Sequence, residues 1–158
     1  MKLYLAGAIE AAPDDGMAWR KDLTQFLKSE LDWDVFDPSR HEKDFLTTEE
    51  KMNFRTWKSV DIKRFRPVIK KIIDRDLHQL LKECDAVICL WDEYVIHGGG
   101  THGELTLAYE HQLPVYLVLG LPIEKVSSWI IGCTSEVFSD FEELKQYLSS
   151  KSFKNNGE

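Results

Sequence analysis

One segment of the chain has residue types and spacing that could perform chemistry. The sequence HGGGTHGELTLAYE starts at His97 and places three glycines and Thr101 ahead of Glu104. Glycines let a backbone approach a ligand closely, and a helix starting here would point its unpaired N–H groups at an anion. A carboxylate in its first turn is expected to stay ionised. It could attack the anomeric carbon of a sugar, dividing a difficult displacement into two easier steps.

Glu104 also has a purely structural alternative. Thr101-x-x-Glu104 is the pattern of a capping box, in which the glutamate only binds the backbone of the N-cap residue. On this segment alone the structural role is favoured. The glycine run does not distinguish the catalytic from the structural role of Glu104, because it lacks the lysine and spacing of a P-loop and does not match GxGxxG.

Two other segments contain candidate polar residues. Tyr4 alternates with apolar residues in KLYLAGAIE, and a tyrosine in a buried strand usually finds a partner for its hydroxyl. Asp74 and Asp76 precede the apolar helix in IDRDLHQLLKECDAVICLW. On periodicity alone, both aspartates are expected to be solvated surface residues.

Short apolar runs alternate with segments of helical spacing, which predicts a single α/β domain. Strands are expected at 2–6, 33–36, 86–91, 115–119 and 136–138, and helices at 17–31, 68–83 and 140–148, with a short extra helix from Thr47 through Trp57. The best match is a flavodoxin-like, doubly wound, five-stranded parallel sheet. Ligands bind such sheets at the carboxyl ends of the strands, where strand order reverses, which points to the loops after the first and third strands.

The length of 158 residues and the 43% hydrophobic content fit one domain, expected over 1–150. The polar end, 151–158, is expected to be disordered, and the long connection over 37–67 is either a lid or a simple elaboration.

The charge balance and cysteine usage exclude several classes of partner. A net charge of −7 argues against a nucleic-acid polymer, and the basic residues between Lys58 and Arg75 are expected to form a solvated helix face. Cys84, Cys89 and Cys133 lack metal-ligand spacing and are expected to be buried, reduced thiols. With no signal peptide, membrane-spanning run, metal motif or dinucleotide motif, we expect a cytoplasmic protein that has no membrane partner and works without metal or cofactor.

Taken together and in order, YLAGAI, DRDL leading into ECDAVICLW, and GGGTHGEL resemble the nucleoside 2-deoxyribosyltransferases and the related nucleotide N-glycosidases. The resemblance covers about residues 2 to 133, because PVYLVL and SSWIIG also fit.

The resemblance implies a role for each matching residue. Glu104 would be the nucleophile, Tyr4 would orient it, and Asp76 would help to bind the deoxyribose and the reacting base region. Ser127 would reach the 5′ end of the sugar in a neighbouring subunit, so a homo-oligomer (dimer or higher) with shared active sites is implied. The remaining candidate substrate-binding residues are Gly7, Ala8, Ile9, Gly98, Gly100 and Thr101.

The function implied is cleavage of the N-glycosidic bond of a (deoxy)nucleoside, with transfer of the sugar to another free base. One alternative is hydrolysis of a (deoxy)nucleoside 5′-monophosphate or other modified nucleotide, and another is a non-catalytic nucleotide-binding module. Nucleotide-hydrolysing members have a small hydroxyl residue and an arginine after the first strand, where this chain has Ala8 and Glu10, followed by Asp14 and Asp15. A nucleoside is therefore favoured over a nucleotide. Gly98 replaces a polar residue of the family, which leaves base selection to Asp92, Glu93 or His97.

Overall fold

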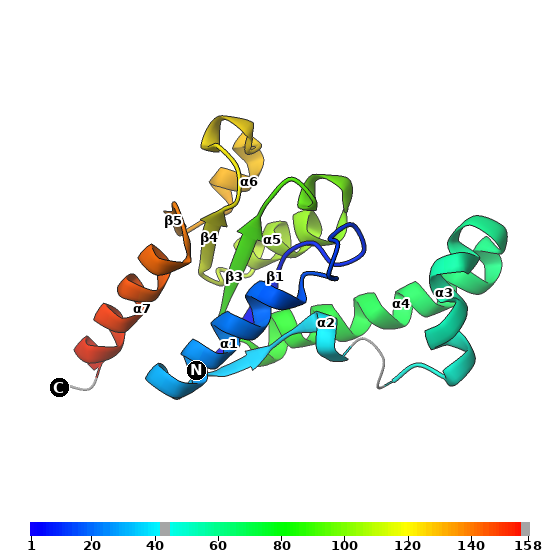
Figure 1. The fold of residues 1–158 in the computed structure, drawn as a ribbon, viewed down its shortest axis with the longest axis horizontal. Coiled ribbons are helices and arrows are strands. Elements are labelled where there is room, and N and C mark those ends of the chain that lie inside the picture. The colour runs from blue at the N-terminus through cyan, green and yellow to red at the C-terminus, as the bar shows by residue number, and fades with distance from the viewer. Residues whose placement is uncertain (42–44, 156–158) are drawn as a thin grey trace.

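The computed structural model describes residues 1–41 and 45–155, which form a five-stranded sheet (Figure 1). The strands are β1 (Lys2–Ala6), β2 (Asp34–Phe36), β3 (Ala86–Trp91), β4 (Val115–Leu119) and β5 (Glu136–Phe138). All neighbouring strands are parallel, in the order β2-β1-β3-β4-β5. The predicted flavodoxin-like sheet is therefore confirmed, and strand order reverses between β1 and β3.

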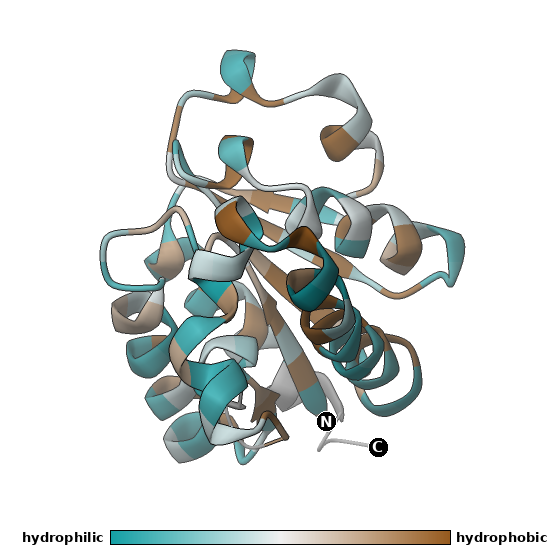
Figure 2. Cartoon of the chain, turned by 90° about the vertical axis from the view of Figure 1, so that its right-hand side faces the viewer, coloured by the Kyte–Doolittle hydropathy of each residue, from teal (hydrophilic) through white to brown (hydrophobic). Residues whose placement is uncertain are grey.

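Helices cover both faces of this sheet. They are α1 (Met17–Leu31), α2 (Pro38–His41), α3 (Thr48–Val60), α4 (Ile62–His78), α5 (Gly100–Glu110), α6 (Ser128–Gly132) and α7 (Phe141–Asn155), with a π-helical turn η1 (Gln79–Glu83) and two short 3₁₀ segments, η2 (Val95–His97) and η3 (Ile123–Lys125). Figure 2 shows the hydrophobic strands enclosed by helices whose outer surfaces are largely hydrophilic.

Alternation along β1 sends its side chains into two separate cores. Leu3 and Leu5 pack with α1 and α7, whereas Tyr4 packs with Leu80 of η1 and Leu105 of α5 on the opposite face. Tyr4, which the sequence predicted to be a buried tyrosine, thus lies on the face of the sheet that α5 covers. Cys84, Cys89 and Cys133 are buried free thiols, as expected.

The long connection after β2 forms the α3–α4 hairpin (residues 48–78), which extends from the body of the fold (Figure 1). Thr47 and Glu50 form the predicted capping box of α3. The prediction that the next helix starts at Val68 was wrong, because α4 begins at Ile62 and continues through Pro67. Packing between the two helices, in a third apolar cluster that includes Trp57 and Val68, outweighs the cost of that proline.

The C-terminal helix is also longer than predicted. It runs to Asn155, where we expected disorder from residue 151 onwards. The ammonium of Lys151 lies 4.6 Å from the ring centre of Tyr147, one turn earlier, a cation–π contact that favours the added helical turn. The rest of the expected tail, 156–158, lies outside the described residues. Among the helices of the described chain, none is long and apolar enough to cross a membrane.

Candidate active site

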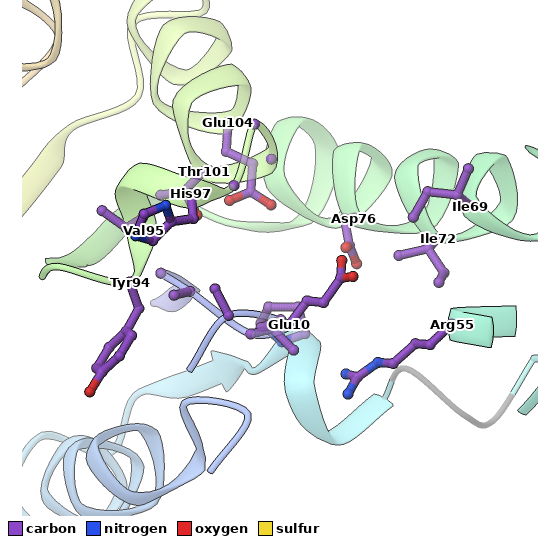
Figure 3. Close-up of a pocket in the computed structure, with 18 of the residues that line it drawn as sticks. Glu10, Arg55, Ile69, Ile72, Asp76, Tyr94, Val95, His97, Thr101 and Glu104 are labelled. Carbon is purple, nitrogen blue, oxygen red and sulfur yellow. The ribbon is translucent and has the colours of Figure 1, made fainter. Parts of the chain in front are cut away.

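A cavity of about 440 Å³ opens at the carboxyl ends of β1 and β3. One wall is the β1–α1 loop (residues 7–16), a second is the segment from Tyr94 to Glu104, and the third is the α3–α4 hairpin (Figure 3). Candidates named from the sequence line it together: Gly7, Ala8, Ile9, Asp76, Gly98, Gly100, Thr101 and Glu104. Strand-order reversal therefore brings segments that are far apart in the chain to one place.

The carboxylate of Glu104 is hydrogen-bonded to Tyr4. The Tyr4 hydroxyl donates a hydrogen bond of 2.6 Å to Oε1 of Glu104, and Tyr4 is completely buried. Burial, followed by the charges of Glu104 and Asp76, raises the pKa of the Tyr4 phenol well above its ordinary value. The phenol is consequently a neutral donor at physiological pH. Glu104 itself lines the cavity, with its carboxylate among the side chains that surround the open space (Figure 3).

The capping alternative for Glu104 is wrong. The N-cap of α5 is Gly99 and has no side-chain hydrogen bond, so Thr101 lies inside the helix rather than at its cap. Glu104 is consequently in the second turn, and its carboxylate binds Tyr4 instead of the helix backbone.

The same offset changes the expected charge state of Glu104. Its carboxylate lies beyond the first turn, where the unpaired N–H groups and the helix dipole act most strongly. Burial raises the pKa of Glu104 to about 7, the Tyr4 hydrogen bond and Arg20 lower this pKa, and Asp76 raises it. The carboxyl group therefore changes its protonation state near neutral pH rather than staying ionised throughout.

Asp76 faces the cavity from α4 (Figure 3). The preceding residue, Arg75, forms an ion pair with it. Both Nε and Nη2 of Arg75 contact Oδ1 of Asp76, at 2.8 and 2.6 Å. Nη2 also donates to the backbone oxygen of Pro38, at 3.3 Å. This ion pair favours the carboxylate form of Asp76, which accepts hydrogen bonds, over the protonated form, which would donate one.

The glycines that line the cavity have two different roles. Gly7 has φ of +153°, and a Cβ there would lie 3.1 Å from the Trp19 ring, so the loop requires glycine. A Cβ at Gly99 or Gly100 would meet no atom within 4 Å. The latter glycines therefore widen the cavity at the start of α5.

The acidic β1–α1 loop is balanced by the α3–α4 hairpin. Asp14 accepts hydrogen bonds from backbone N–H groups at the start of α1 and is occupied there. Glu10 pairs with Lys58 at 2.9 Å, and Asp15 pairs with Arg55 at 3.1 Å. The loop itself carries no cation, but Arg55 and Lys58 of the hairpin both line the cavity and bring positive charge to it.

Comparisons with known proteins were made at three levels. No protein-family model and no curated protein matches the sequence. Among solved structures, the 2-deoxyribosyltransferase of the psychrotolerant Bacillus psychrosaccharolyticus is similar over 93% of this chain and 92% of its own, with a TM-score of 0.68 and 19% identity. A CMP N-glycosidase of Clostridium botulinum covers 96% of this chain and 99% of its own (TM-score 0.54, 20% identity).

The chain has the 2-deoxyribosyltransferase fold. A conserved protein from Enterococcus faecalis V583 has it too, with a TM-score of 0.59 and 15% identity over 96% of this chain and 98% of its own. These neighbours support the family to which the sequence motifs pointed.

Within this 2-deoxyribosyltransferase fold, Ser127 lies apart from the cavity of its own chain. It is exposed, immediately before α6. Of the three candidates for base selection, Asp92 caps the turn after β3 by accepting from the N–H groups of Tyr94 and Val95. Glu93 does not line the cavity, whereas His97 does.

Sequence reasoning missed the contribution of the α3–α4 hairpin. Phe65, Ile69 and Ile72 line the cavity from α4, beside Asp76, which the family resemblance had already named. Their spacing of i, i+4, i+7 and i+11 places them on one helical face, and that periodicity was the available signal. The interpretation of the basic segment as a fully solvated face missed Lys58, and the role of Arg55 had no comparable signal.

Proposed function

We propose that the protein cleaves the N-glycosidic bond of a (deoxy)nucleoside through a covalent intermediate on Glu104 and transfers the sugar to another base. The observation that carries this proposal is the hydrogen bond from the buried Tyr4 hydroxyl to Glu104, which lines the cavity. A carboxylate held by one oxygen presents the other to an anomeric carbon, and burial removes the water that would weaken it as a nucleophile.

In the first step an oxygen of ionised Glu104 bonds to C1′ while the C1′–N bond breaks. The base first takes up a proton from solvent, so that it leaves neutral when the electron pair of the C1′–N bond passes to its nitrogen. Asp76, kept as a carboxylate by Arg75, accepts a hydrogen bond from that protonated base. In the second step a nitrogen of the acceptor base attacks C1′, and the bond between C1′ and Glu104 breaks. The acceptor base then gives up its proton to solvent.

Mutation of Glu104 tests this function. We expect Glu104→Gln to abolish exchange between deoxynucleosides and a free base, measured by chromatography, while the protein stays folded. Glu110→Gln, on the exposed end of the same helix, is the matched control and should retain parental activity. Rapid denaturation during turnover should capture a deoxyribosyl adduct on the Glu104 peptide. Parental turnover by Glu104→Gln would refute the assignment, and no turnover by the parent with any substrate would favour a binding module.

A second candidate, hydrolysis of a nucleoside 5′-monophosphate, is favoured by one observation. Arg55 and Lys58 line the cavity, where they could replace their contacts with Asp15 and Glu10 by contacts to a phosphate. Water would then take the place of the acceptor base at the glycosyl intermediate. Release of free base from a monophosphate without any acceptor would identify this activity.

The exposed face formed by α5 and α6 supports a shared active site. Trp129 is 67% exposed, and its indole N–H donates to Oγ1 of Thr106 at 3.0 Å, while Tyr109 is 60% exposed. Aromatic surface of this kind is enriched at protein interfaces. We propose that a second copy covers it and that Ser127, which precedes α6, then reaches the neighbouring cavity.

A further inference from the structure

Arg20 of α1 is a buried cation to which the proposed reaction gives no role. It has no exposed surface, and its guanidinium donates to four backbone oxygens. These bonds are Nε to Leu5 at 3.3 Å, Nη1 to Ala8 at 3.2 Å and to Gly16 at 2.9 Å, and Nη2 to Gly7 at 2.9 Å. One side chain thus joins the end of β1 to both ends of the β1–α1 loop.

These contacts fix the face that the β1–α1 loop turns to the cavity. In a trans peptide the carbonyl and the following N–H point in opposite directions. Carbonyls directed at Arg20 therefore leave the N–H groups of Ala8 and Ile9 on the other side of the backbone, and both residues line the cavity. The planar guanidinium fork holds several of these carbonyls at once, which the single ammonium of a lysine could not do in the same geometry.

The charge of Arg20 is only partly balanced by its own carboxylate. Oδ1 of Asp37 lies 3.6 Å from Nε of Arg20, but Asp37 also contacts Arg40 at 3.4 Å and accepts hydrogen bonds from Ser39. Burial lowers the pKa of Arg20, while Asp37 and then Glu104 raise it. Arg20 donates to the carbonyls of Gly7 and Ala8, which line the same cavity as Glu104, so its buried charge lies behind this wall and lowers the pKa of Glu104.

We infer that Arg20 is a positioning residue of the active site: its guanidinium moulds the β1–α1 loop and places a buried positive charge behind the wall that this loop forms in the cavity of Glu104. This inference rests on the proposed function for its catalytic meaning. Its structural content, an electrostatic link between Arg20 and Glu104, can be measured without substrate.

Several groups from different elements determine the charge state of Glu104. They are the Tyr4 hydroxyl on β1, Asp76 on α4 and Arg20 on α1; the Cys89 thiol on β3 is buried and stays neutral, because burial and then Glu104 raise its pKa. Burial and Asp76 favour the neutral acid, whereas Tyr4 and Arg20 favour the carboxylate. Loss of the arginine charge should therefore make Glu104 harder to ionise, and no other cation in this set compensates.

The test is an NMR titration of protein labelled with ¹³C at the glutamate carboxyl carbons, with the Glu104 signal assigned by its absence from Glu104→Gln. In Arg20→Gln we expect the Glu104 midpoint to rise by about half a pH unit or more. In Arg20→Lys, which keeps the charge and loses the fork, the midpoint should stay near the parental value while KM rises about tenfold. Lys21→Gln removes an exposed positive charge from the same helix and should change neither the Glu104 midpoint nor KM.

A second variant covers the case in which Arg20→Gln does not fold. A Cβ at Gly16 would lie 2.3 Å from Nη1 of Arg20 and 2.4 Å from the Ala8 oxygen, so Gly16→Ala should displace the fork and raise KM at nearly unchanged kcat. An unchanged midpoint in folded Arg20→Gln, or parental KM in both Arg20→Lys and Gly16→Ala, would overturn the inference. A shifted midpoint in a protein that turns over no substrate would instead reject the proposed function and leave the Arg20 link standing.

Discussion

Replacing Glu104 by glutamine should make the protein more stable at alkaline pH, even as it removes the nucleophile. Burial raises the pKa of this carboxyl from 4.5 to about 7. Between those values the folded protein keeps a proton that the unfolded chain has released, so the free energy of unfolding falls as pH rises through this window. The pKa difference corresponds to about 3 kcal/mol.

Glutamine avoids that cost because it is neutral at every pH and can still accept the Tyr4 hydrogen bond. Its amide N–H groups need partners of their own, so we expect a net gain of about 1–3 kcal/mol at pH 8 and little gain at pH 4.5. Urea unfolding at both pH values, followed by tryptophan fluorescence, measures this. The control is Glu110→Gln, whose stability should follow the parent at both. If Glu104→Gln and the parent lose stability in parallel between pH 4.5 and 8, the raised pKa is wrong.

Three further predictions concern the chemistry. Tyr4→Phe removes a hydrogen bond to a charged group, worth about 1.5–3 kcal/mol, so activity at pH 7 should fall about tenfold or more. Activity should partly recover at pH 9, and equal pH–rate profiles for the variant and the parent would discredit the contact. Mixing Glu104→Ala with Ser127→Trp chains should restore partial activity through hybrid sites, and a parent that is monomeric by light scattering would rule this out. We predict that a deoxynucleoside is turned over faster than its 5′-monophosphate, and a salt-sensitive preference for the monophosphate would assign Arg55 and Lys58 to phosphate binding instead.

The central strands β1, β3 and β4 could be predicted from the sequence because each is a short apolar run that helices cover on both faces of the sheet. Residues Lys2–Ala6, Ala86–Trp91 and Val115–Leu119 have the predicted bounds. The start of α4 could not be predicted in the same way, because Pro67 is a local breaker and the packing that overrides it comes from α3. The π-helical turn η1 likewise has no local signature of its own.

The site was only partly predictable, for a related reason. Tyr4 and Glu104 are 100 residues apart, and it was a family resemblance, rather than spacing, that paired them. The contacts from Lys58 to Glu10 and from Arg55 to Asp15 span 48 and 40 residues between exposed groups. Surface ion pairs leave no pattern in a sequence, so the charge balance of the cavity emerged only from the fold.

The apolar cluster inside the α3–α4 hairpin gives this wall of the cavity a stability of its own. Leu46, Phe54, Trp57, Val68 and Ile72 pack with one another, apart from both sheet cores. Two exposed ion pairs, which are weak and screened by salt, link α3 to the β1–α1 loop. We expect the outer part of the hairpin, which packs in this separate cluster, to open locally more readily than the sheet. Its backbone amides should exchange with deuterium sooner than those of β3, more so at high salt. Access to the cavity would then depend on a local opening equilibrium instead of on global unfolding.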